Sequence, residues 1–370
     1  MPISPLSTSL PTSRSTTLLT VLHAAAALAL AAIAALTSPE AHAQGAQGAQ
    51  GAQGKTELLV YSALEADQIK AYKTAFEQDH PAIELKFVRE STGIVTARLL
   101  AEKANPQADV VWGLAATSLM LLDKEGMLAP YAPKGLEQVR ATMRDPRPQP
   151  TWVGMDLWSS AVCFNTVEAA KRNLPKPTSW ADLTQPVYKG LLTMPHPASS
   201  GTGYLMVSAW LQMMGEAKGW AFMDALHQNM GVYTHSGSKP CRQAGAGEFP
   251  VGLSFEYRAN KTRKEGAPID IVFPKEGLGW DVEATAVMKT TKRMEAAKAL
   301  ADWSVTRKAN ELYAKNFAVL ALPSVQEQLE FVPSDLDKLL AKNDFNWAAA
   351  NRDRILAEWS RRYEAKAEKK

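Results

Sequence analysis

Cysteine is nearly absent from this sequence, which has two among its 370 residues, and neither sign of charge dominates. So few cysteines exclude the disulfide-dense scaffolds that many small exported proteins use. The 41 basic and 38 acidic residues give a net charge of +3, too small for the basic surface of a nucleic-acid-binding protein. With 46% hydrophobic residues and 22 each of glycine and proline, the composition indicates an ordinary folded protein rather than a low-complexity chain.

Several motifs of catalysis and cofactor binding are also missing. The sequence has no His-Glu-x-x-His string and no paired Cys-x-x-Cys, so nothing in it indicates a zinc site. It has no Gly-Lys-Ser/Thr string and no Gly-x-Gly-x-x-Gly, so nothing indicates a bound nucleotide or dinucleotide. The sequence therefore predicts neither a metal nor another cofactor.

The longest apolar run, Leu18–Leu36, lies near the start of the chain, after a single basic residue, Arg14. Small residues follow it at Ala41 and Ala43, on either side of His42, which is the pattern of an export signal cleaved after Ala43. An uncleaved membrane anchor is the alternative, because the run is nearly long enough to span a bilayer. We expect a signal peptide at 1–43, a periplasmic product and a flexible Gly-Ala-Gln leader at 44–54.

Export to an oxidising compartment leaves two interpretations of Cys163 and Cys241. The two form the single disulfide that two cysteines allow. Alternatively they are buried free thiols, since unpaired cysteine packs as a small hydrophobic residue. The sequence does not choose between these two possibilities.

Strands and helices alternate along the rest of the chain. Apolar or alternating runs predict strands at 58–61, 83–87 and 109–112, each followed by a helical pattern. This order is typical of α/β folds with right-handed crossovers, and it predicts a mainly parallel sheet. The proline-rich segment Arg144–Pro150 interrupts the order, and an extended run at Trp152–Asn165 begins a second α/β unit. Two such units joined by more than one crossing predict a ligand cleft between them.

Two hydroxyl-rich turns in the second unit connect a predicted strand to a predicted helix. They are Ser199-Ser200-Gly201-Thr202-Gly203 and Thr234–Lys239. Small residues let backbone N–H groups approach an anion, hydroxyls donate to it, and the helix N-terminus adds partial positive charge. The two turns can hold a tetrahedral anion between them. An ordinary serine-rich helix cap is the alternative.

Ser236 and Lys239 also form the Ser-x-x-Lys string of penicillin-binding enzymes. That interpretation needs Ser-Asp-Asn and Lys-Thr-Gly elsewhere, and neither string occurs. An exported serine hydrolase that uses Ser200 or Ser236 is therefore only a remote alternative.

Carboxylates stand beside aromatic residues near several predicted strand ends. In chain order they are Glu65 after the first strand, Trp112 at the end of the third strand, Glu256 with Tyr257 and Arg258, and Asp281 and Glu283 after Trp280. A carboxylate with an aromatic face suits an ammonium group. In most proteins such residues are exposed charges or core aromatics. Their position at strand ends nevertheless favours a ligand contact here.

Seven strings, in order, resemble the substrate-binding proteins of ABC importers. The similarity runs from about Leu58 to Pro323 and is greatest to the 2-aminoethylphosphonate-binding subfamily, within the group of ferric-ion-binding periplasmic proteins. The strings are Leu59–Glu65, Glu90–Ala97, Ala108–Ala115, Ser199–Gly203, Thr234–Gln243, Phe255–Arg258 and Gly279–Glu283.

The resemblance implies a type II periplasmic binding protein: an α/β fold with two Rossmann-like lobes that close around one ligand in the cleft between them. Ferric-binding relatives hold a phosphate through turns that match Ser200–Thr202 and Ser236–Ser238 here. Their iron ligands match Glu65, Leu114 and Tyr257-Arg258. Leucine cannot ligate iron, and arginine replaces an anionic phenolate by a cation. The resemblance therefore implies a tetrahedral anionic head group held without a metal, with Arg258 able to contact it.

We therefore predict the periplasmic component of an ABC importer, a monomer without enzymatic activity, that binds an organophosphonate and above all 2-aminoethylphosphonate. Its partners are this ligand and an ABC permease in the inner membrane. Ser200, Gly201, Thr202, Ser236, Ser238, Tyr257 and Arg258 are expected at the phosphonate, and Glu65, Trp112 and Asp281 at the amine. A protein of the same fold that binds ferric ion, inorganic phosphate or a polyamine is the alternative.

The resemblance also implies a division of the mature chain. Lobe 1 is expected at 55–152 and again at 280–335, lobe 2 at 153–279, and C-terminal helices at 336–370, packed on lobe 2. The hinges are expected within Val153–Trp158 and Gly279–Glu283.

Overall fold

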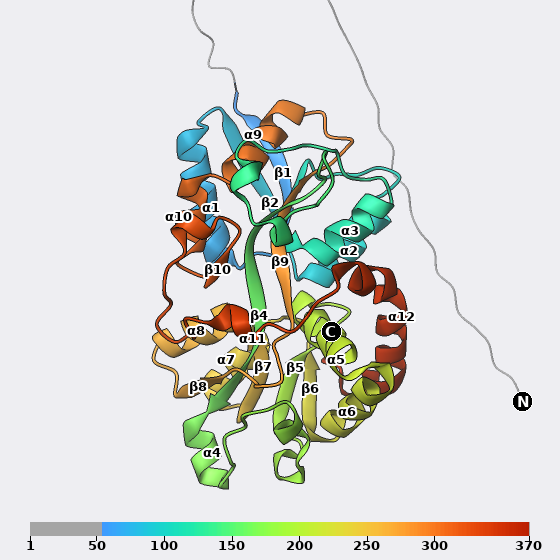
Figure 1. Cartoon of the computed structure of the whole chain (residues 1–370), viewed down its shortest axis with the longest axis vertical. Coiled ribbons are helices and arrows are strands. Elements are labelled where there is room, and N and C mark those ends of the chain that lie inside the picture. The colour runs from blue at the N-terminus through green and yellow to red at the C-terminus, as the bar shows by residue number, and fades with distance from the viewer. Residues whose placement is uncertain (1–53, 370) are drawn as a thin grey trace, which may run out of the picture. The chain divides into compact units, whose positions relative to one another are not determined.

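A ten-stranded sheet runs through residues 54–369, the part of the chain that the computed structural model describes (Figure 1). The strands are β1 Thr56–Ser62, β2 Ile83–Arg89, β3 Val110–Ala115, β4 Val153–Asn165, β5 Leu192–Pro195, β6 Met230–Thr234, β7 Val251–Phe255, β8 Ile269–Val272, β9 Trp280–Val287 and β10 Val319–Leu320. The helices are α1 Ala66–Asp79, α2 Thr92–Ala101, α3 Ala116–Lys124, α4 Thr166–Arg172, α5 Gly201–Met214, α6 Glu216–Asn229, α7 Lys239–Ala246, α8 Glu256–Lys264, α9 Met294–Ser304, α10 Arg307–Tyr313, α11 Leu336–Leu339 and α12 Phe345–Tyr363.

The predicted signal peptide, its cleavage site and all but the last residue of the predicted leader lie outside the described residues. Within residues 54–369, no helix combines the length and the apolar character that crossing a membrane requires.

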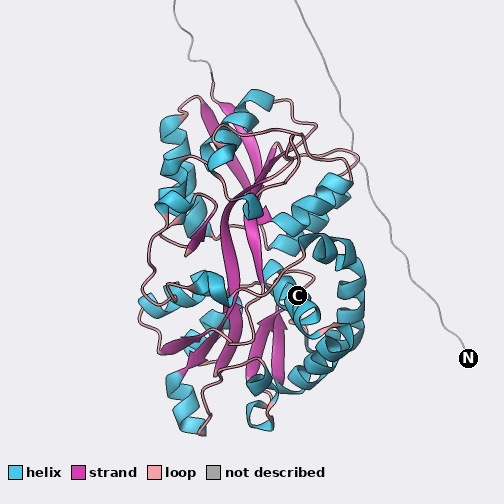
Figure 2. Ribbon diagram, viewed as in Figure 1, coloured by secondary structure: helices cyan, strands magenta, loops and turns pink. Residues whose placement is uncertain are grey.

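Lobe 1 is the part built on β1, β2 and β3, which pair in parallel in the order β2-β1-β3. Its helices α1, α2, α3, α9 and α10 surround these strands (Figure 2). Strand β3 is buried along its whole length, as expected for a strand covered on both faces. The aromatic side chains Tyr72, Trp112 and Tyr313 fill the core between the sheet and α1 and α10.

Lobe 2 is the part built on β5, β6 and β7, with β5 parallel to both neighbours, and it carries α4 to α8 (Figure 1). The C-terminal helix α12 packs on it: Tyr204 Oη of α5 donates to the Ala348 carbonyl, and Arg362 pairs with Asp224 of α6 at 2.9 Å. The same helix also lies against α3 of lobe 1.

Strand β4 is shared by the two lobes. Its first half pairs antiparallel with β9 and β10, and residues 160–165 pair antiparallel with β7 and β8. Strand β9 in turn pairs antiparallel with β3. The sheet is therefore mixed, and the prediction of a mainly parallel sheet was wrong for its centre. The chain enters lobe 2 along β4 and returns along β9, so the two adjacent crossing strands run in opposite directions.

Candidate ligand-binding site

A narrow cavity, partly open to solvent, lies between the two lobes, and the space within it and at its mouth together is about 490 Å³. Lobe 1 lines it with residues that follow β1 and β2, among them Glu65, Gln68, Ser91 and Thr92. Lobe 2 contributes its two hydroxyl-rich turns, Ser200–Thr202 and Ser236–Gly237. The shared strands β4 and β9 supply Trp158 and Glu283. Most of these side chains are polar, as a site for a small polar ligand requires.

Helix N-termini from both lobes meet at this cavity. Ser91 is the N-cap of α2, and its side chain makes no capping hydrogen bond. Ser200 is the N-cap of α5, and its hydroxyl accepts from the Gly203 N–H at 3.4 Å. The first backbone N–H groups of a helix have no partner inside the helix and carry partial positive charge. The cavity therefore offers donors and positive potential to an anion.

The two lobes touch directly beside these helix starts. The Gly93 N–H of α2 donates to the Ser199 carbonyl of lobe 2 at 3.0 Å. A Cβ at Gly201 would lie 2.7 Å from Thr92 Oγ1, closer than real Cβ contacts allow. Glycine is required at both positions because each brings its backbone against the opposite lobe. The structure therefore shows the lobes in contact, around a narrow cavity.

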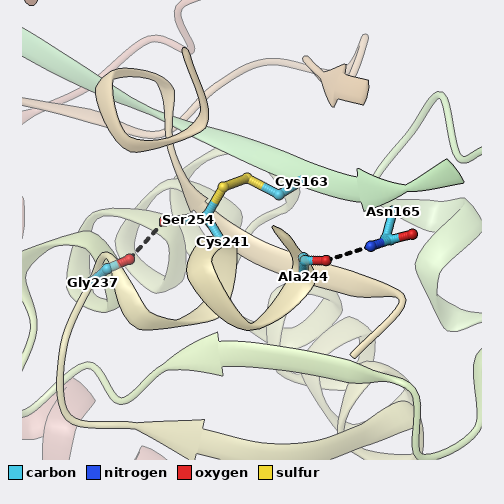
Figure 3. The surroundings of a disulfide bond; sticks show 6 residues. All are labelled: Cys163, Asn165, Gly237, Cys241, Ala244 and Ser254. Carbon is cyan, nitrogen blue, oxygen red and sulfur yellow. Dashed lines mark hydrogen bonds between the residues drawn. A yellow bond between two sulfur atoms is a disulfide. The ribbon is translucent and has the colours of Figure 1, made fainter. Parts of the chain in front are cut away.

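The second turn is held by contacts behind it. Ser236 Oγ and Ser238 Oγ are 2.9 Å apart, and the Gly237 carbonyl accepts from Ser254 Oγ at 2.7 Å (Figure 3). Lys239 pairs with Glu368 near the end of the chain. The Glu368 carboxylate also accepts from the His235 N–H at 3.1 Å. The C-terminal residues thus fix the turn from outside, and Lys239 points to them.

Cys163 and Cys241 form a disulfide, which decides between the two possibilities that the sequence leaves open. The bond ties β4 to α7, the helix that follows the second turn (Figure 3). Asn165 Nδ2 donates to the Ala244 carbonyl at 2.7 Å and adds a second link between the same elements. Both links therefore restrain α7 relative to β4.

We expect the double substitution Cys163→Ala and Cys241→Ala to lower the free energy of unfolding by about 2–4 kcal/mol, because the disulfide closes a long loop in the unfolded chain. The two cysteines are 78 residues apart. Urea titration of the wild-type and double-alanine proteins measures the difference, and reduced wild-type protein is the matched control. Equal denaturation midpoints with and without reductant would contradict the expectation.

Glu65 lies at the cavity but already has cationic partners. Its carboxylate pairs with Arg258 at 3.0 Å, Arg242 at 3.3 Å and Arg89 at 3.5 Å. Arg258 and Arg242 come from lobe 2, so these pairs connect the lobes. Tyr257 Oη likewise donates to Asp67 of α1 at 2.7 Å. Tyr257 and Arg258 therefore contact lobe 1 side chains, and neither lines the cavity.

Two other predicted site residues lie away from the cavity lining. Trp112 is fully buried in the lobe 1 core, because Gly113 and Ala115 on the same strand face the cavity and side chains alternate between faces. Asp281 is buried beside α3, where it accepts from Thr117 Oγ1 at 2.5 Å. Burial raises the pKa of Asp281 to about 6.

Sequence reasoning did not assign a role to several residues that line the cavity. Ser91 and Thr92 form a third hydroxyl-bearing strand-to-helix turn, and this pattern is the local signal that could have identified them. Gln68 lies one turn into α1, and no local pattern distinguishes it. Glu283 was noted beside Asp281 but was not selected.

Among the described residues, no group of three or more His, Cys, Asp and Glu side chains is arranged to hold a metal ion. Leu114, which the sequence resemblance matches to an iron ligand of ferric-binding proteins, is fully buried.

Comparisons with known proteins agree with this architecture. The family described as bacterial extracellular solute-binding protein matches residues 105–354. An uncharacterised protein of Haemophilus influenzae is 27% identical over 312 residues, which cover 82% of this chain and 90% of that protein. A probable ABC transporter periplasmic-binding protein of Sinorhizobium fredii, y4fP, is 26% identical over 275 residues, 72% of this chain and 75% of its own length.

A solved structure resembles the chain over most of its length. It is the periplasmic binding protein AfuA of Actinobacillus pleuropneumoniae, with exogenous fructose-6-phosphate bound. It superposes with a TM-score of 0.79 at 28% identity and covers 84% of this chain and 99% of its own. The two-lobed α/β fold of a type II periplasmic binding protein, expected from the sequence, is thus confirmed.

Proposed function

The chain belongs to the family of bacterial extracellular solute-binding proteins, and from this premise we propose that its ligand is an organophosphonate, specifically 2-aminoethylphosphonate. Proteins of this family bind a small molecule for an ABC importer and are not enzymes. We place this protein in the periplasm, where the predicted signal peptide would deliver it. An exported hydrolase at Ser200 or Ser236 is set aside, because the family is one of binding proteins.

The observation that carries the proposal is the meeting of three hydroxyl-bearing turns at one cavity. Ser91–Thr92, Ser200–Thr202 and Ser236–Gly237 all line it, from both lobes. A phosphonate oxygen can accept from hydroxyls and from unpaired N–H groups at the starts of α2 and α5. Contacts to both lobes favour the closed arrangement over the open one. The fructose-6-phosphate bound to AfuA also ends in a tetrahedral phosphorus oxyanion, which supports the same class of head group.

We assign the head group to Ser200, Gly201, Thr202 and Ser236, with Ser238 supporting Ser236 through their 2.9 Å hydroxyl contact. In this proposal Arg258 connects the two lobes and does not contact the ligand, because its guanidinium is paired with Glu65. Iron is disfavoured, since a leucine and an arginine occupy positions where the ferric-binding relatives have ligands.

We expect Thr202→Val to weaken binding of 2-aminoethylphosphonate by about 10–100-fold, because hydrogen bonds to charged groups contribute about 1.5–3 kcal/mol. Valine keeps the shape of threonine and removes only the hydroxyl. Isothermal titration calorimetry measures the dissociation constants, with exposed Thr74→Val of α1 as the control. Inorganic phosphate, spermidine and fructose-6-phosphate are titrated in parallel. Tight binding of one of these without binding of 2-aminoethylphosphonate would overturn the proposed ligand.

A further inference from the structure

One carboxylate on the cavity wall, Glu283, has two more carboxylates buried behind it, where β4, β9 and α8 meet. Glu283 of β9 lines the cavity and stands directly opposite Asp156 of β4 in the strand register. Glu256, at the start of α8, reaches the same strand: its Oε2 accepts from the Ser159 N–H at 2.7 Å. Mutual repulsion with Glu283 and Glu256 adds to the effect of burial in raising the pKa of Asp156. These residues therefore form one group of interacting acidic side chains, the β4–β9 carboxylate cluster.

The cluster has several unused hydrogen-bonding atoms. Asp156 and Glu256 are fully buried, and no N–H or hydroxyl group in the described part of the chain donates to either oxygen of Asp156. The side chains of Asp156 and Glu283 are instead within hydrogen-bonding reach of each other. Neither Glu256 Oε1 nor Glu283 Oε2 has a partner among the described residues. Burial of an unpaired carboxylate is costly, so such a group holds a proton or receives a cation.

The groups that face the cluster from neighbouring elements do not supply that cation. Tyr72 of α1 and Tyr313 of α10 are neutral phenols whose pKa burial raises well above the usual value, with further increases from Asp156 and Glu283. Glu65 adds another negative charge on the Glu283 side. Arg258, two residues after Glu256, and Arg89, which lines the same cavity, are both paired with Glu65. The wall is therefore acidic, with aromatic rings behind it.

Gln68 provides an independent sign that a ligand group completes this cavity. Its side chain is 3% exposed and lines the cavity from α1. Its Oε1 accepts from the Glu65 N–H at 2.8 Å, whereas its Nε2 has no partner. A buried amide donor without a partner is rare and points to a missing acceptor. The cavity thus lacks an acceptor for Gln68 Nε2 and a cation for the carboxylates. A small zwitterion supplies both, because its anionic group accepts hydrogen bonds and its ammonium group is the cation.

We propose that Glu283, backed by Asp156 and Glu256, binds the ammonium group of an amino-substituted anion. This inference rests on the proposed function and moves the amine contact away from Glu65, whose charge three arginines already balance. The hydroxyl-bearing turns take the oxyanion, and the carboxylate cluster takes the other end of the same molecule. The primary ammonium donates N–H groups, and Oε2 of the cavity-lining Glu283 has no partner among the described residues. A phosphonate without an amine fills only half of the site.

The test compares 2-aminoethylphosphonate with ethylphosphonate, which has the same head group and no amine. In isothermal titration calorimetry, we expect Glu283→Gln to weaken 2-aminoethylphosphonate binding by about 100-fold, since truncation of one buried charged partner has effects of that size. Its affinity for ethylphosphonate should stay within about twofold of wild type, which also shows that the variant folds. Glu84→Gln on β2, outside the cavity, is the matched control and should change neither affinity.

The outcomes separate the two proposals. Equal weakening of both ligands by Glu283→Gln, or no weakening of either, would overturn the ammonium subsite and leave the phosphonate function standing. Failure of wild-type protein to bind either phosphonate would overturn the proposed function and the subsite with it. The subsite is supported if the affinity for 2-aminoethylphosphonate relative to ethylphosphonate falls in the Glu283 variant and not in the Glu84 variant.

Discussion

Gly93→Ala is expected to raise the dissociation constant for 2-aminoethylphosphonate by more than about 100-fold while leaving the empty protein as stable as wild type. A Cβ at this position would lie 2.0 Å from the Ala198 carbonyl oxygen and 2.9 Å from the Ser199 carbonyl carbon. Both atoms belong to the backbone of the opposite lobe, which cannot move aside as a flexible side chain can. The methyl group must therefore hold the lobes apart, and a ligand that needs contacts from both loses one set.

Within lobe 1 the same substitution should be harmless, because alanine is a better helix former than glycine in α2. Calorimetric titration measures the affinity, and thermal unfolding of the ligand-free protein measures the stability. Ile94→Ala, at the next and exposed position of α2, is the control and should change neither value. Wild-type affinity in the Gly93 variant would show that closure does not bring these backbones together.

The free energy of unfolding of the ligand-free protein is expected to fall as the pH rises from about 4.5 to 8. Burial raises the pKa of both Glu256 and Glu283 to about 8, well above the ordinary value of 4.5. In this window the folded protein binds protons that the unfolded chain has released. Stability therefore decreases with pH, by about 1.4 kcal/mol per pH unit for each such group. The stabilisation is complete below the unfolded pKa and is lost as the pH passes the folded value.

Other groups modify this slope in known directions. Asp281, with a pKa raised to about 6, adds to the decrease in the lower half of the window. Burial lowers the pKa of His227, which opposes the decrease near the ordinary histidine value of 6.5. The Arg147 side chain and backbone N–H groups hold the pKa of Asp145 below its ordinary value. Asp145 therefore affects the free energy of unfolding only at pH values below this window.

Urea titrations at several pH values measure the slope. Glu283→Gln removes the Glu283 contribution together with the part of the raised Asp156 pKa that Glu283 causes. The variant should show a shallower decrease between pH 5 and 8, whereas the control Glu84→Gln, at a partly exposed position outside the cavity, should keep the wild-type slope. Stability of the wild-type protein that rises steadily through this window would mean that Glu256 and Glu283 are ionised in the folded state.

Local sequence patterns were sufficient for most of the scaffold. A short apolar run located β1, and alternation of apolar and polar residues located β2. The hydroxyl-rich turn at Ser199–Gly203 was correctly predicted to begin a helix. Trp152–Asn165 was correctly interpreted as extended chain. Its pairing was not predicted, because the same strand serves both lobes and its partners β7 and β9 come from distant parts of the sequence.

The site was harder to predict because its residues are selected by long-range register. Asp281 and Glu283 are both acidic and two residues apart, so local sequence cannot rank them. Pairing with β4 places Glu283 opposite Asp156 and Asp281 opposite Trp158, and only Glu283 reaches the cavity. The balance of charge at Glu65 likewise depends on arginines from three separate elements. The predicted hinges and lobe boundaries, like the assigned ligand contacts, stay predictions.

The last described residues of the chain pack on lobe 2, beside the proposed oxyanion site. Ala367 forms a bridge with Tyr233 of β6, and Glu368 binds His235 and Lys239 on either side of the serine-bearing turn. A purification tag or reporter domain fused directly after this tail would pull on the turn that is proposed to hold the oxyanion. Anyone building a sensor from this protein should therefore insert the reporter elsewhere, or should expect its signal and its selectivity to change together.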